Sequence, residues 1–182
     1  MSTARRAVAV DRAAGSLGAA EHLVHDLDEA LAGLFPGEDH VVSTHTVREP
    51  VGRFVAVVSW SDGPEPGEVA ARLRAALPDA AVGDSGTAVE EARHRTAGRL
   101  ARYPGRTPVE RRTTPAEAVA ASCLDAVEGL AGTVVTPDTG LDLTGFARPV
   151  WRDGRCVLLV QRGADALIPF EVRHQTACCS DH

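Results

Sequence analysis

The chain has 182 residues, 44% of them hydrophobic and 24% charged, and a net charge of −6. These values are typical of a globular protein, and no apolar run reaches the roughly 18 residues needed to cross a bilayer. Lysine is absent, which excludes chemistry that needs a P-loop or Schiff-base lysine. The N-terminus lacks a long apolar region, so we expect a cytoplasmic protein with no membrane partner.

The first 86 residues predict two helices among four strands. Weak apolar alternation predicts a strand over 5–11, and runs typical of strands predict three more over 40–47, 53–60 and 80–82. Ser16 is a suitable N-cap for a helix that reaches about Leu34, and a second helix is expected over 68–77. This β-α-β-β-α-β order is that of a ferredoxin-like unit, which we take as the first domain, 1–86. His40 and His45 bracket the second strand and point to opposite faces.

An arginine-rich segment, 87–112, follows as a predicted helix over 87–103 and a linker. Seven arginines and one acid, Glu110, lie between Arg93 and Arg112. Such a local excess of positive charge favours an anion or an acidic partner. The residues that we assign to an anion site are Arg95, Arg99 and Arg102. A solvated face with Glu–Arg pairs is the alternative, and the near absence of aromatic residues disfavours nucleic acid.

The third predicted domain, 113–175, combines a helix with a β-meander. Thr114-Pro115-Ala116-Glu117 has the pattern of a capping box, and the helix is expected to continue to about Leu130. Three antiparallel strands are expected over 146–152, 155–161 and 166–174. Asp153-Gly154 is typical of a two-residue type I′ turn between the first two. The predicted fold class is therefore α+β: a ferredoxin-like unit, then helices and a three-stranded meander, with one broad sheet as the alternative.

The C-terminal tail, 176–182, together with the residue at 174, concentrates soft metal ligands. The candidate ligands are His174, Cys178, Cys179, Asp181 and His182. If this segment is helical, at about 100° per residue all of them except Cys179 share one face. Imidazole, thiolate and carboxylate groups suit zinc, and the first two also suit copper or iron. A tail without any chemical role is the alternative.

Three functions remain open from the sequence. The tail predicts a small metal-binding protein, either a metal-dependent enzyme or a protein that carries the metal. The arginine-rich segment instead predicts a non-enzymatic interaction or regulatory module that docks an acidic protein. The adjacent thiols of Cys178 and Cys179 predict a redox protein. The candidate partners are an acidic protein and a second copy of the chain, which would make a homodimer.

Overall fold

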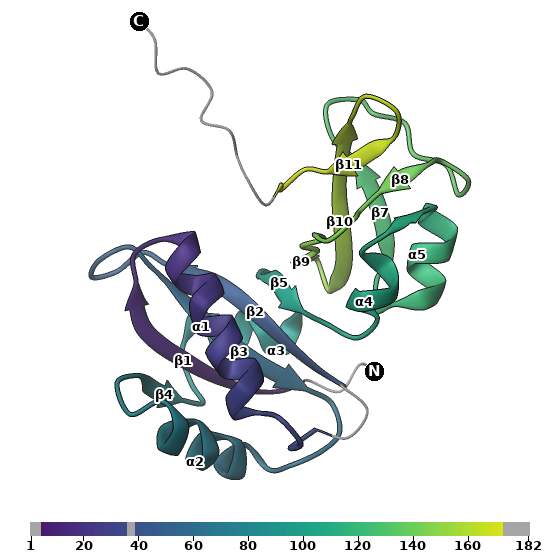
Figure 1. The fold of residues 1–182 in the computed structure, drawn as a ribbon. Coiled ribbons are helices and arrows are strands. Elements are labelled where there is room, and N and C mark those ends of the chain that lie inside the picture. The colour runs from purple at the N-terminus through teal and green to yellow at the C-terminus, as the bar shows by residue number, and fades with distance from the viewer. Residues whose placement is uncertain (1–4, 36–38, 173–182) are drawn as a thin grey trace, which may run out of the picture. The chain divides into compact units, whose positions relative to one another are not determined.

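The computed structural model describes residues 5–35 and 39–172, and within them the chain forms two compact units (Figure 1). Residues up to 104 together with 150–156 belong to the first unit, and 105–149 with 157 onward belong to the second. Both units contain helices and strands, and most strand pairs are antiparallel. The predicted fold class is therefore confirmed at the level of mixed α and β structure.

Six strands in the first unit form a sheet in the order β4-β1-β3-β2-β5-β9, and every pair of neighbours is antiparallel. The strands are β1 (Arg6–Ala14), β2 (His40–Val47), β3 (Arg53–Trp60), β4 (Ala81–Gly83), β5 (Arg99–Arg102) and β9 (Val150–Arg152). Strands β2 and β3 are paired along their full length, from His40 opposite Trp60 to Val47 opposite Arg53. Their bounds match the predicted ranges, because runs rich in β-branched and aromatic residues favour strands.

Two helices and one face of this sheet enclose the hydrophobic core of the first unit. They are α1 (Leu17–Ala30) and α2 (Pro66–Ala76), and Figure 1 shows α1 lying across the strands. Ser16 caps α1 as predicted, since its side chain accepts a hydrogen bond from the backbone N–H of Ala19. Leu27 of α1 and Leu73 of α2 are fully buried in the same apolar cluster as Trp60.

A third helix, α3 (Thr87–His94), packs on β1, β2 and β3. None of its residues belongs to the core that α1 and α2 cover. Adjacent strand positions point to opposite faces, so Val42 belongs to that core while His45 faces α3. This arrangement leaves a layer of buried side chains between the sheet and α3.

The predicted helix over 87–103 is wrong beyond His94. Arg95 adopts a left-handed conformation, with φ 57°, and ends α3. Residues 99–102 instead form β5, which pairs with β2 and buries Leu100 and Ala101. Helical periodicity could not reveal this pairing because the partner strand lies more than 50 residues away in the sequence.

The second unit contains two short helices and five strand segments. They are α4 (Arg106–Val109), β6 (Arg112–Thr113), α5 (Pro115–Ala121), β7 (Ala126–Gly129), β8 (Leu141–Asp142), most of β10 (Arg155–Arg162) and β11 (Leu167–Pro169). Strand β10 pairs parallel with β7 and antiparallel with β11. The positive φ angles of Asp153 and Gly154 before β10 confirm the predicted type I′ turn.

The predicted helix from Thr114 to Leu130 is half as long in the structure. Its start is confirmed, because Thr114 and Glu117 form the capping box. Its end is wrong: Ser122 is extended, and residues 126–129 form β7 against β10. The backbone N–H of Leu124 donates to the Ser122 hydroxyl, which itself donates to the Ala118 carbonyl and so closes the last helical turn.

Candidate functional site

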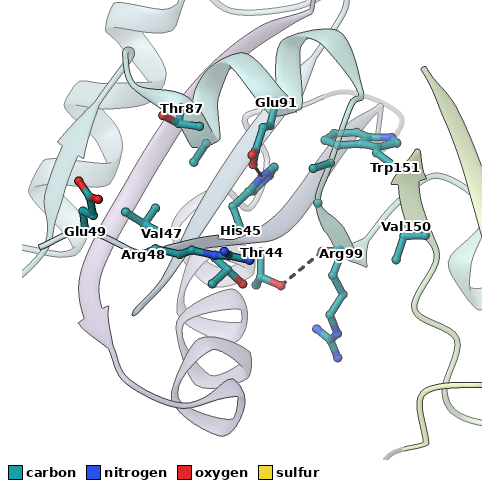
Figure 2. Close-up of a pocket in the computed structure, with 14 residues that line it drawn as sticks. Thr44, His45, Val47, Arg48, Glu49, Thr87, Glu91, Arg99, Val150 and Trp151 are labelled. Carbon is teal, nitrogen blue, oxygen red and sulfur yellow. Dashed lines mark hydrogen bonds and ion pairs between the residues drawn. The ribbon is translucent and has the colours of Figure 1, made fainter. Parts of the chain in front are cut away.

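A pocket of the first unit lies at the C-terminal end of β2. Its volume is about 790 Å³, and four segments line it: the end of β2, α3, the turn before β5, and β9 (Figure 2). We call it the Trp151 pocket, after the tryptophan that forms one wall beside Gly98. Only 4% of Trp151 is exposed. Residues of the first unit alone make this pocket.

A buried histidine on β2 connects the sheet to α3 at the back of the Trp151 pocket. The side chain of His45 has no exposed surface, and Figure 2 shows it pointing at Glu91 of α3. Its Nδ1 lies 2.8 Å from Oε2 of Glu91, and its Nε2 lies 2.8 Å from Oγ of Ser43. Both ring nitrogens are therefore satisfied within the protein.

Burial sets the protonation state of this histidine. The pKa of His45 is lowered from its ordinary value, because the cost of burying a charged imidazole outweighs the stabilising contact with Glu91. The ring is thus neutral near pH 7. A carboxylate only accepts hydrogen bonds, so Nδ1–H of His45 donates to Glu91 and Nε2 accepts the hydroxyl proton of Ser43.

The order Ser43–His45–Glu91 resembles the hydrogen-bond chain of a serine hydrolase, yet it lacks access for a substrate. Ser43 is fully buried and does not line the Trp151 pocket. Gly98 covers the edge of the imidazole: a Cβ built there would lie 2.7 Å from Cε1 and 2.9 Å from Nε2 of His45. The three residues therefore hold α3 on β2, and no acyl group can reach the serine hydroxyl.

Gly98 also brings β9 to the pocket. Its carbonyl accepts a hydrogen bond of 2.8 Å from the backbone N–H of Trp151. Its φ is +129°, a conformation that residues with a side chain rarely adopt, and its Cβ position lies 3.3 Å from Cε3 of Trp151. A glycine is therefore required for His45 and Trp151 to approach one another this closely.

The three arginines predicted to bind anions are not on one helix face. Arg95 ends α3, whereas Arg99 and Arg102 lie on β5. Each of the latter two meets an acid of α1: Arg99 lies 2.7 Å from Glu21 and Arg102 lies 3.3 Å from Asp28. Of the three, only Arg99 lines the Trp151 pocket. Anion binding by these residues stays a prediction.

The predicted metal ligands, His174, Cys178, Cys179, Asp181 and His182, lie outside the described residues. Within 5–35 and 39–172, no three histidine, cysteine or acidic side chains gather as a metal site would require. Of the other two cysteines, Cys156 is buried and Cys123 is half-buried. Metal binding by the tail, whether of zinc, copper or iron, therefore stays a prediction from the sequence.

Sequence reasoning singled out His45 for its strand position and did not connect it with Glu91, Gly98 or Trp151. One local signal was present: Ser43 and His45 are two residues apart on a predicted strand and so share a face. The remaining partners lie 46 or more residues away, and no spacing rule joins them. The pocket is a product of long-range packing.

In the part of the chain that the structure describes, no helix combines the length and apolarity needed to span a bilayer. Comparison with known proteins assigns no relative from which a function could be transferred. No protein-family model, no curated protein and no solved structure matches the chain.

Proposed function

We propose that the first unit is a binding module for a small organic molecule, which it holds in the Trp151 pocket. The observation that carries this proposal is a pocket of about 790 Å³ with a tryptophan wall and, behind it, the buried His45 paired with the half-buried Glu91. Ligand pockets commonly measure about 300–1,000 Å³ and combine aromatic walls with a few fixed polar groups.

The hydrogen-bonded pair of His45 and Glu91 behind the pocket supports a functional role for the pocket. Burying an imidazole and part of a carboxylate costs free energy that an apolar pair of the same volume would avoid. His45 and Glu91 join β2 to α3, the two elements that supply half of the lining residues. Perturbed buried groups beside a cavity are more frequent at functional sites than elsewhere.

Binding is favoured over catalysis because the reactive edges are occupied. Both nitrogens of His45 are engaged by Glu91 and Ser43, and Gly98 covers the edge of the ring that carries Cε1 and Nε2. A general base needs a nitrogen within about 3.2 Å of the substrate proton, which these contacts prevent. The described residues of the pocket thus serve to shape and orient a ligand.

The experiment is a screen of small organic molecules by ¹H–¹⁵N NMR. The chain has two tryptophans, so two indole N–H signals are expected, and Trp151→Phe assigns them. Ligands should shift the Trp151 signal and leave that of Trp60, which donates to the Pro64 carbonyl in the core, unchanged.

Ala97→Trp should abolish the shift, because Ala97 is half-buried and lines the pocket. The matched control is Ala116→Trp at an exposed site of α5 in the second unit, which should leave binding intact. The proposal fails if ligands shift both indole signals equally, or if Ala97→Trp binds as the unmodified protein does.

We further infer that the first six elements, β1 to β4 with α1 and α2, form a ferredoxin-like unit. The strand order β4-β1-β3-β2, antiparallel throughout, and the helices sharing one core support this. A three-stranded meander of β9, β10 and β11 is supported by the type I′ turn before β10 and the antiparallel pairing of β10 with β11. These fold assignments add nothing to the functional argument.

A further inference from the structure

Four charged side chains line the Trp151 pocket: Arg48, Glu49, Glu91 and Arg99. Three of them differ in whether another side chain of the protein already binds them. Glu91 is bound to His45, and Arg99 is bound to Glu21 of α1. The side chain of Arg48, the first residue after β2, has no hydrogen-bond or ion-pair partner among the described residues. It therefore retains its full capacity to donate hydrogen bonds to a ligand.

Arg48 and Glu49 are neighbours in the sequence, but their side chains point in different directions. One end of the pocket is therefore cationic. Figure 2 shows the side chain of Arg48 extended toward Thr44, and the carboxylate of Glu49 pointing away from Arg48. The Thr44 hydroxyl donates weakly to the Arg99 carbonyl, at 3.5 Å, and its oxygen can still accept. A guanidinium presents a planar fork that matches the two oxygens of a carboxylate.

Resting on the binding function proposed above, we infer that the ligand is an aromatic carboxylic acid. Its carboxylate binds Arg48 and its ring packs against Trp151. Both side chains line this pocket. Of the two acids in the lining, Glu91 is engaged by His45, and the carboxylate of Glu49 points away from Arg48 (Figure 2).

The test compares two probes of one shape, 2-naphthoate and 2-naphthamide, by titration against the Trp151 indole signal. Hydrogen bonds to a charged acceptor are stronger than neutral ones, so naphthoate should bind about fivefold more tightly at low salt. Arg48→Gln should remove this preference. The matched control is Arg162→Gln, an exposed arginine of the second unit that also lacks a partner among the described residues, and it should keep the preference.

The outcomes separate this inference from the proposed function. Equal affinities for the two probes, or a preference that survives Arg48→Gln, overturn the acid specificity while binding in the pocket still stands. If neither probe nor any screened molecule shifts the Trp151 signal, the binding function itself fails. Weaker binding of naphthoate as salt rises would support the charge contact, since ions screen an exposed arginine.

Discussion

Replacing Gly98 by alanine tests the packing that forms the Trp151 pocket. The new Cβ would lie 2.7 Å from Cε1 of His45 and 3.3 Å from Cε3 of Trp151, at a φ of +129°. Backbone strain of this kind costs about 1–3 kcal/mol, and forcing an extra methyl into a packed site costs a further 1–3 kcal/mol or so. We therefore expect a loss of roughly 2–6 kcal/mol in the free energy of unfolding.

The assay is urea denaturation, with Gly33→Ala as the matched control. Gly33 also has a positive φ, +76°, but no atom lies within 4 Å of its Cβ position. The control therefore reports backbone strain alone, at about 1–2 kcal/mol. If Gly98→Ala costs no more than Gly33→Ala at an unchanged m value, His45 and Trp151 do not enclose Gly98 as described.

Three other predictions concern His45, the capping box and the tail. Burial lowers the pKa of His45, so the unfolded chain binds its proton more readily, and the free energy of unfolding should fall as pH drops below about 6.5. In urea titrations, this loss of unfolding free energy at low pH should be smaller for His45→Gln and unchanged for His25→Gln, a control at an exposed site. Equal losses in the unmodified protein and both variants would contradict the role given to His45. Thr114→Ala should cost about 1 kcal/mol by thermal or urea unfolding and Thr114→Ser much less, because only a hydroxyl accepts from the Glu117 N–H; similar losses would argue against the cap. Metal analysis of protein without a His-tag should find stoichiometric zinc, copper or iron, and the double variant Cys178→Ala, Cys179→Ala should lose that metal. Metal-free protein whose tail thiols titrate freely would refute the prediction of a metal site in the tail.

Local chemistry was sufficient to predict several elements. The runs of apolar and β-branched residues over 40–47 and 53–60 predicted β2 and β3 with their correct ends. Ser16 and Thr114 marked the starts of α1 and α5, because a side-chain oxygen there satisfies backbone N–H groups that have no other partner. Asp153-Gly154 predicted a turn because both residues tolerate positive φ. Each of these signals depends on residues within four positions of one another.

Tertiary packing decided the rest. Residues 99–102 read as helix in the sequence and form β5, because pairing with β2 satisfies their backbone and buries Leu100. The same long-range pairing shortens the predicted helix after Ala121, where 126–129 joins β10 instead.

The Trp151 pocket also combines a feature that local sequence determines with contacts that only long-range packing creates. The sequence by itself determined that Ser43 and His45 share one face of a strand. Only the tertiary structure brought Glu91, Gly98 and Trp151 to that histidine, from 46 to 106 positions along the chain. Strand alternation is dictated by backbone geometry within two residues, whereas a pocket depends on which distant surfaces exclude water together.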